Sequence, residues 1–181
     1  MTGPGRVTKS GALESATYHT RFASLDDYEK GGVELINDDA RHYAFSNVFE
    51  VASRSRPYEK VAVGKNRQYV LEAIRAEGTS DWRTCAHDEF ALVMDGEVRI
   101  ELAKVSDEQA PDPASEGDRA LEGEPGGPRM GEIIARRGHM TLLPSGAAYR
   151  FHAEVPGVIL MQTIEGPDTV FKWAEIVQTT P

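Results

Sequence analysis

Two segments of the chain combine apolar alternation with turn residues at fixed spacing. In EFALVMDGEV, Glu89 starts an alternating run and Gly96 follows it seven positions later. In GHMTLLPSGAAY, Gly138 is followed six positions later by Pro144 and then by Gly146. A period of two is typical of strands that bury one face, and glycine or proline between such runs predicts tight turns. These segments therefore predict short β-strands joined by sharp turns.

Similar runs occur at near-regular intervals along the chain. Strands are predicted over 43–52, 69–78, 89–95, 97–104, 140–143, 148–153, 157–164 and 169–176. Gly96 between two of them predicts a hairpin. A short helix is predicted after Ser24-Leu25-Asp26-Asp27, ended by Gly31-Gly32. Many short strands are typical of an all-β protein, a sandwich or barrel of antiparallel strands of the jelly-roll kind.

Composition limits the class of protein. A length of 181 residues suits one domain with a hydrophobic core. The net charge of −9 argues against a nucleic-acid partner, because binding a phosphate backbone requires a basic surface. The single cysteine, Cys85, excludes an intrachain disulfide framework, and we find neither a signal-peptide core nor a membrane span. We therefore expect a cytoplasmic protein that binds no membrane.

Two segments differ from the rest in composition. Residues 1–20 are small, polar and glycine-rich, and we interpret them as a flexible N-terminal arm on a single barrel domain formed by 21–181. Residues 105–132 are rich in Pro, Gly, Asp and Glu and nearly free of apolar residues. This composition predicts a mobile, solvated loop inserted between two strands of the barrel.

The two turn-marked segments resemble the two motifs of the cupin family. In cupins, three histidines and a glutamate from these motifs bind a metal ion inside a small β-barrel. Here Glu89 matches the glutamate, but the histidine pair falls within residues 82–85, which are Trp, Arg, Thr and Cys. The second motif has Tyr149 at the histidine position and Ala153 at the asparagine position. The resemblance implies a cupin-type barrel that has lost most of its metal ligands.

Strand alternation places Cys85, His87 and Glu89 on one face, which points into the barrel in the cupin frame. His87 and Glu89 with His152, or with His139, would supply two imidazoles and a carboxylate, the usual ligands of non-haem Fe(II). Strand alternation argues against His152. Tyr149 occupies an inward position, and a residue three positions later on the same strand faces away from the interior. The direction of His139, in a turn, stays open.

A hydrogen-bonded polar cluster without metal is the alternative interpretation of this degenerate cupin site. The Tyr149 ring would fill the vacated cavity, with its hydroxyl bonded to Glu89 or His87. Cys85 is interpreted as a small buried apolar residue. A thiol nucleophile activated by His87 is a further alternative, for which no orienting partner is identifiable.

Longer segments are similar to the small subunit of two-component hydroquinone 1,2-dioxygenases. They are INDDARHYAFSNVFEVASRSRPYEKVAVGKN, YVLEAIRAEGTSDW, HDEFALVMDGEV, RRGHMTLLPSGAAYRF and VFKWAEI, and together they cover approximately residues 25–176. In that family a small and a larger cupin-like chain form a two-plus-two heterotetramer, and the larger chain holds Fe(II). These enzymes open the ring of hydroquinone with O2 to give 4-hydroxymuconic semialdehyde.

The resemblance implies that this chain is a metal-free subunit that supports assembly and the substrate channel of an iron-bearing partner. Trp82 is the first candidate for a contact with the substrate channel or the interface, as an apolar plate beside a flat ring. Arg83 and Asn47 are polar candidates for the same role. Two alternatives stay open. One is a self-sufficient cupin metallo-dioxygenase with a rearranged ligand set, and the other is a non-enzymatic cupin that binds a small molecule.

Overall fold

The computed structural model of the chain describes residues 47–66 and 68–172. The predicted arm 1–20 and the helix predicted after Asp27 lie outside these residues. So do 43–46 and 173–176, which belong to the first and last predicted strands. Among the described residues, no helix combines the length and the apolar character needed to cross a membrane.

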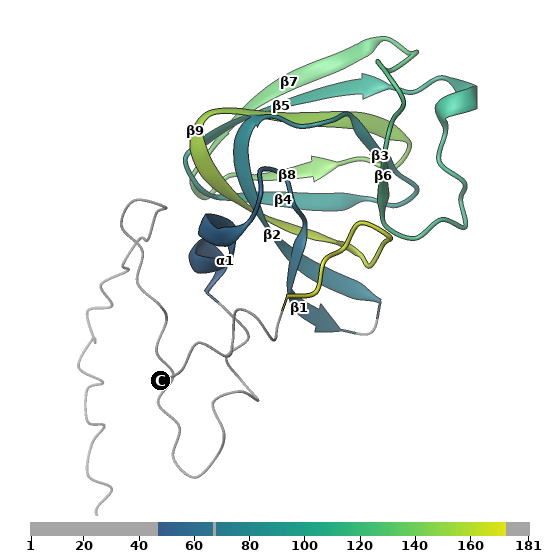
Figure 1. Cartoon of the computed structure of the whole chain (residues 1–181). Coiled ribbons are helices and arrows are strands. Elements are labelled where there is room, and N and C mark those ends of the chain that lie inside the picture. The colour runs from purple at the N-terminus through teal and green to yellow at the C-terminus, as the bar shows by residue number, and fades with distance from the viewer. Residues whose placement is uncertain (1–46, 67, 173–181) are drawn as a thin grey trace, which may run out of the picture.

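A curled sheet of nine antiparallel strands forms the body of the molecule (Figure 1). The strands are β1 (Val61–Asn66), β2 (Tyr69–Thr79), β3 (Arg83–Cys85), β4 (Glu89–Asp95), β5 (Glu97–Lys104), β6 (Asp118–Ala120), β7 (Arg129–Arg136), β8 (Met140–Leu143) and β9 (Ala147–Ile164). A buried apolar cluster from β2, β4, β5 and β9 fills the inside of the curl. The predicted all-β fold, a barrel-like sheet of antiparallel strands, is confirmed.

Strand β9 holds the two halves of the barrel together. Its first part pairs with β5 from Ala147 to His152, and its second part pairs with β4 from Val158 to Gln162, while β2 runs along its other side. The strands predicted at 148–153 and 157–164 are therefore one strand. Pro156 lies between the stretches that pair with β5 and β4, where its missing N–H breaks no ladder.

The predicted hairpin at Gly96 is wrong, although both strands have the predicted bounds. β4 pairs with β8 and β9, whereas β5 pairs with β7 and β9. Gly96 instead forms a corner at which the chain passes from one part of the barrel to the other. It has a φ of +79°, and a Cβ built on it would lie 3.0 Å from Gly157 Cα, so both the conformation and the close approach require glycine.

The strand predicted over 43–52 is also wrong where it is described, because Val48–Arg54 forms the helix α1. The Asn47 side chain accepts hydrogen bonds from Phe49 N (3.0 Å) and Glu50 N (3.4 Å) and so caps the helix. Val51 and Ala52 are buried on the face that packs against β1 and β2. Asn47 with an acid three positions later was a helix-start signal that the apolar alternation masked.

The segment 105–132 has more structure than its composition predicts. It contains a 3-10 turn, η2 (Asp107–Gln109), the strand β6 and the first residues of β7. β6 pairs with β3 and brings Asp118, only 3% exposed, to the barrel interior. Leu121 packs beside Trp82 in a small buried cluster. A few inward residues therefore fix a segment whose other residues face solvent.

The final predicted strand, 169–176, is not formed in its described part. Residues 169–172 contain only an isolated bridge, from Val170 to Val61 of β1. Val170 N donates to the Lys60 carbonyl and the Val170 carbonyl accepts from Ala62 N. This bridge holds Lys60 and the start of β1 against the segment that follows β9.

Candidate polar site inside the barrel

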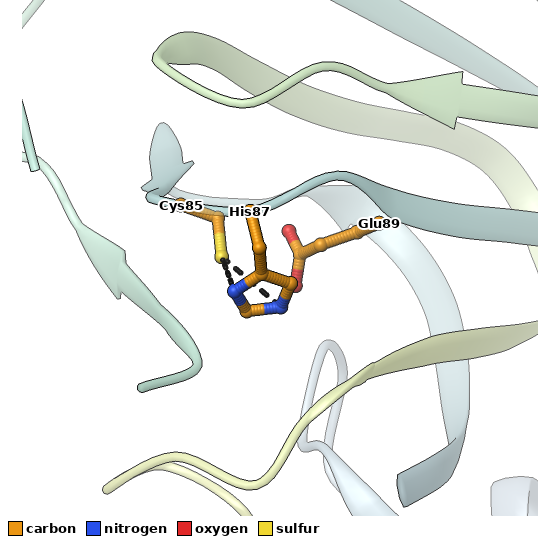
Figure 2. Close-up of side chains that lie close together, drawn as sticks. All are labelled: Cys85, His87 and Glu89. Carbon is orange, nitrogen blue, oxygen red and sulfur yellow. Dashed lines mark hydrogen bonds between the residues drawn. The ribbon is translucent and has the colours of Figure 1, made fainter. Parts of the chain in front are cut away.

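Cys85, His87 and Glu89 come together inside the barrel, as Figure 2 shows. Cys85 ends β3, His87 lies in the short connection, and Glu89 begins β4. Their ligand-type atoms all lie within 4.8 Å of one another. The alternation of the sequence places Cys85 and Glu89 inward, and both are at most 2% exposed.

The hydrogen bonds of His87 define a neutral ring. Its Nε2 accepts from Ile164 N at 3.1 Å, so Nε2 carries no proton. Nδ1 then carries it and donates to Cys85 Sγ at 3.0 Å. Burial lowers the pKa of His87, which favours the same uncharged form.

Cys85 is held as a thiol. Its Sγ lies 3.2 Å from the Gly117 carbonyl, to which the S–H donates. Burial and then the nearby Glu89 carboxylate raise the pKa of Cys85 to about 12. The thiolate needed for nucleophilic attack is therefore disfavoured, which argues against a catalytic thiol.

Glu89 is fully buried and makes two hydrogen bonds. Oε1 accepts from Thr163 Oγ1 at 2.5 Å, and Oε2 is hydrogen-bonded to Tyr149 Oη at 2.7 Å. The hydrogen bond expected between Tyr149 and Glu89 is thus present. Burial, followed by repulsion from Asp118, raises the pKa of Glu89 to about 7.

Tyr149 links Glu89 to a second buried carboxylate that the sequence analysis missed. Its hydroxyl oxygen is 2.8 Å from Asp118 Oδ2 as well as 2.7 Å from Glu89 Oε2. One hydroxyl proton cannot serve both acceptors at once. If Glu89 is protonated, both hydrogen bonds can form, because Glu89 then donates to the Tyr149 hydroxyl oxygen and the Tyr149 hydroxyl donates to Asp118.

Asp118 is the centre of a buried ionic group. Its Oδ1 pairs with Lys60 Nζ and its Oδ2 with Arg83 Nε. Lys60 Nζ also lies 3.2 Å from Glu72 Oε2, an atom that has no hydrogen bond among the described residues. Burial alone would raise the pKa of Asp118, but Lys60 and Arg83 outweigh it and lower the pKa.

We call this set the inner polar cluster. It consists of Lys60, Glu72, Arg83, Cys85, His87, Glu89, Asp118, Tyr149 and Thr163. It has two cations against three carboxylates, and burying a net charge is costly. Glu89 is the carboxyl group with the fewest cationic partners, and burial followed by Asp118 raises its pKa. Burial also raises the pKa of Glu72, although Lys60 opposes that shift.

The other predicted site residues are placed differently. Trp82 is 9% exposed and packs with Ala103, Leu121 and Ala148. Its Nε1 donates to Glu124 Oε2 at 2.9 Å, and the Arg150 guanidinium stacks 4.5 Å from its ring centre. Trp82 is therefore a core residue beneath the segment 105–132.

Arg83 and Asn47 also have structural contacts. Arg83 joins the inner polar cluster through Asp118 and reaches the surface through an ion pair with Asp168. Asn47 caps α1. The role of these two residues and of Trp82 at a channel or an interface stays a prediction.

The two other histidines of the described residues do not join the cluster. His152 Nδ1 is 2.8 Å from Thr79 Oγ1 on the other face of β9, the side to which strand parity assigned it. His139 Nδ1 accepts from Arg136 N at 3.0 Å in the turn between β7 and β8. The fallback set of His87, Glu89 and His152 is therefore not assembled.

The donor set does not fit Fe(II). It offers one histidine where the usual site has two, and the Nε2 of that histidine accepts a backbone N–H. Cys85 is a thiol and Glu89 is engaged by two hydroxyls. A metal would have to displace this whole set of hydrogen bonds.

Sequence reasoning missed Lys60, Glu72, Asp118 and Thr163. Glu72 and Thr163 occupy inward positions of predicted strands, so a polar residue on an apolar face was the available signal. Asp118 lies among exposed acids of the same type in the segment 105–132, and Lys60 precedes a strand that was not predicted. Nothing in their local sequence distinguishes these two from surface residues.

Known structures with this fold are similar to the chain at two levels. A chain of hydroquinone 1,2-dioxygenase from Sphingomonas sp. TTNP3, with 4-hydroxybenzoate bound, is 58% identical over 91% of this chain and 99% of that chain, with a TM-score of 0.84. A chain of hydroquinone 1,2-dioxygenase PnpCD, in complex with Cd2+ and 4-hydroxybenzonitrile, is 58% identical over 89% of this chain and 97% of that chain, with a TM-score of 0.81.

A more distant likeness concerns a longer chain. One chain of PnpCD in complex with Fe3+ is 11% identical over 86% of this chain but only 43% of its own length, with a TM-score of 0.59, which shows a shared fold alone. No protein-family model and no curated protein sequence matches this chain.

Proposed function

We propose, from the fact that this chain belongs to the hydroquinone 1,2-dioxygenase family, that it is the metal-free small subunit of a heteromeric, Fe(II)-dependent ring-cleaving enzyme. The enzyme would act in the cytoplasm on hydroquinone and O2 and give 4-hydroxymuconic semialdehyde. The iron would belong to a larger, cupin-like partner. This chain would support assembly and the substrate channel.

The observation that carries the proposal is the identity of 58% over nearly the whole length of a hydroquinone 1,2-dioxygenase chain. A second observation supports two kinds of subunit. This chain matches 97% of one PnpCD chain but 43% of another, so chains of two lengths share the fold. This chain corresponds in length to the smaller kind.

The inner polar cluster supports the assignment of iron to the partner. Its donor atoms are engaged with one another, and its cations, Lys60 and Arg83, already neutralise the most acidic carboxylate. In the assembly, the partner's iron would supply the oxygen chemistry. The residues of this chain would form a rigid support for the substrate channel, because a buried polar network with all its hydrogen bonds made fixes one arrangement of strands.

The outer side of the sheet supports a protein partner. Five large apolar side chains, which we call the outer apolar face, are between 40% and 63% exposed: Tyr69, Leu71, Phe90, Met140 and Leu142. The strand register sets Leu71, Gln162, Phe90 and Leu142 in one row. Outward residues of an antiparallel sheet are usually polar, and a contiguous apolar patch marks an interaction surface. We assign it to the larger subunit.

A hollow lies at one end of this face. Val63, Lys65, Tyr69, Leu71 and Gln162 belong to its lining, and its volume is about 460 Å³. The helix α1 covers the neighbouring part of the same side of the sheet, where Val48 and Leu160 pack against a buried cluster that includes Val63. Trp82, Arg83 and Asn47 stay our candidates for further contacts with the partner or the channel.

Co-expression tests the proposed function. The chain alone, and the chain with a larger cupin partner from the same source, would be purified and assayed for hydroquinone cleavage. We expect a stable complex that produces 4-hydroxymuconic semialdehyde, and an inactive small subunit. Ring cleavage by the small subunit alone would contradict the proposal and favour the self-sufficient metalloenzyme, whose observed support is the approach of Cys85, His87 and Glu89.

A further inference from the structure

Lys60 is the most deeply buried cation of the described residues. It is 5% exposed and lies just before β1, where the backbone bridge to Val170 fixes it. A lysine is seldom buried unless it is paired, because removing an ammonium group from water is costly. Its position inside a barrel whose metal ligands are lost therefore requires an explanation.

The contacts of Lys60 are those of a cation held by carboxylates. Its Nζ pairs with Asp118 Oδ1 and lies 3.2 Å from Glu72 Oε2. Asp118 is joined to Glu89 by the Tyr149 hydroxyl, at 2.8 and 2.7 Å. Carboxylates of β2 and β6 thus lie next to this ammonium, and β4 and β9 are connected to it through Asp118.

We propose that the Lys60 ammonium is a built-in replacement for the metal ion of this barrel, and that it keeps divalent cations out. The inference rests on the proposed metal-free role and deepens it. A barrel with an internal cation folds without metal, so the small subunit is independent of the iron supply that its partner requires.

Electrostatic influence agrees with the geometry. Lys60 is connected through Asp118 and Tyr149 to Glu89, one of the three residues that approach one another as metal ligands would. A divalent cation among these residues would share one buried network with an ammonium group. Like charges in a poorly screened interior repel strongly, so the lysine disfavours metal entry.

The backbone is shaped to bring Asp118 to Lys60. Gly117 precedes Asp118 with a φ of +69°, and a Cβ built on it would lie 2.5 Å from Gly166 Cα. A Cβ on Gly166 would lie 2.8 Å from Gly117 Cα. Two glycines in contact therefore let the segment 105–132 approach the end of β9 closely enough for its carboxylate to enter the barrel.

Removal of the ammonium tests the inference. In the full-length chain, Lys60→Met keeps the length of the side chain, removes the ammonium from Glu72 and leaves Asp118 with Arg83 as its cation. We expect its unfolding temperature to fall by about 10 °C, as for a broken buried ion pair. Added Mn²⁺, a cation that prefers oxygen ligands, should bind and recover most of this loss. Binding is measured as the loss of the electron paramagnetic resonance signal of free Mn²⁺.

Two control variants define what the result means. Lys65→Met removes a half-exposed lysine paired with Glu165, and it should change neither stability nor Mn²⁺ binding appreciably. The double variant Lys60→Met/Asp118→Asn removes both opposite charges and should lose the response to Mn²⁺. The unaltered chain should show no response.

Each outcome decides the inference. A folded Lys60→Met chain that neither binds Mn²⁺ nor is stabilised by it would overturn the inference. Should that variant be insoluble, recovery of soluble protein by Mn²⁺ during refolding supports the inference, and failure of Mn²⁺ to recover it counts against it. Stoichiometric iron in the unaltered chain would instead overturn the proposed function itself, so the two failures are distinguishable.

Discussion

Neighbouring residues of β4 show two opposite regions of the molecule. Glu89 points inward to Tyr149, Thr163 and a buried ionic group, whereas Phe90 points outward and is 40% exposed. The usual pattern is thus reversed at the start of β4, whereas Ala91 and Val93 further along the strand join the buried apolar core. The polar groups inside satisfy one another, and the apolar face outside suits a protein partner.

The largest effect on the interior is expected from Asp118→Ala. It would leave Lys60 and Arg83 buried without their shared carboxylate, which typically costs roughly 3–5 kcal/mol of the free energy of unfolding. Urea unfolding of the full-length chain measures this loss. Glu122→Ala, on an exposed residue of the same segment, should change it by less than about 0.5 kcal/mol. Equal effects of the two changes would show that the ionic group does not hold the barrel.

The outer face is tested by Phe90→Asp. A charge in the middle of the apolar row should weaken binding of the larger subunit by roughly thirty-fold, about 2 kcal/mol, and leave the isolated chain folded. Met130→Asp is the matched control, because Met130 is 45% exposed on β7, outside this row. Analytical ultracentrifugation of the mixed subunits gives the affinities. If Phe90→Asp weakened self-association of this chain and left its affinity for the larger subunit unchanged, the outer apolar face would be assigned to a second copy of this chain.

The pH dependence of stability sharpens the comparison, since Glu89 is a buried carboxyl group. Its folded pKa is raised from the ordinary value of 4.5 to about 7. The stability that this group contributes is therefore fully present below pH 4.5 and is lost as pH rises through about 7.

We therefore expect the unaltered chain to lose stability relative to Glu89→Gln between these pH values, by on the order of 1–3 kcal/mol. Urea unfolding of both proteins at several pH values measures the difference. Parallel curves for the two proteins would mean that Glu89 does not titrate in this range.

The smallest effect is expected at the helix that lies on the outer side of the sheet. Asn47→Ala removes the side chain that caps α1 and should cost about 1 kcal/mol of the free energy of unfolding. Asn47→Asp should restore most of the stability, because aspartate is as good a cap. Loss of partner binding in Asn47→Asp at unchanged stability would instead place Asn47 at the interface.

Sequence reasoning identified the parts of the fold that local patterns determine. The alternation in 89–95 and 97–104 marks both strands correctly, but pairing depends on which strands meet in space, and Gly96 turned out to form a corner. The same limit applies to the site. Cys85, His87 and Glu89 come together as a period of two predicts, although His87 lies in the connection between β3 and β4. Lys60 and Asp118 are 58 residues apart in the sequence and are linked only by tertiary structure.

The central claim is that the small subunit holds no metal of its own. It is tested most directly by measuring iron in each subunit after the active complex has been separated into its two chains. The account predicts close to one iron per larger subunit and a negligible amount in this chain. Iron retained by this chain in stoichiometric amount, and lost on His87→Ala, would contradict the account.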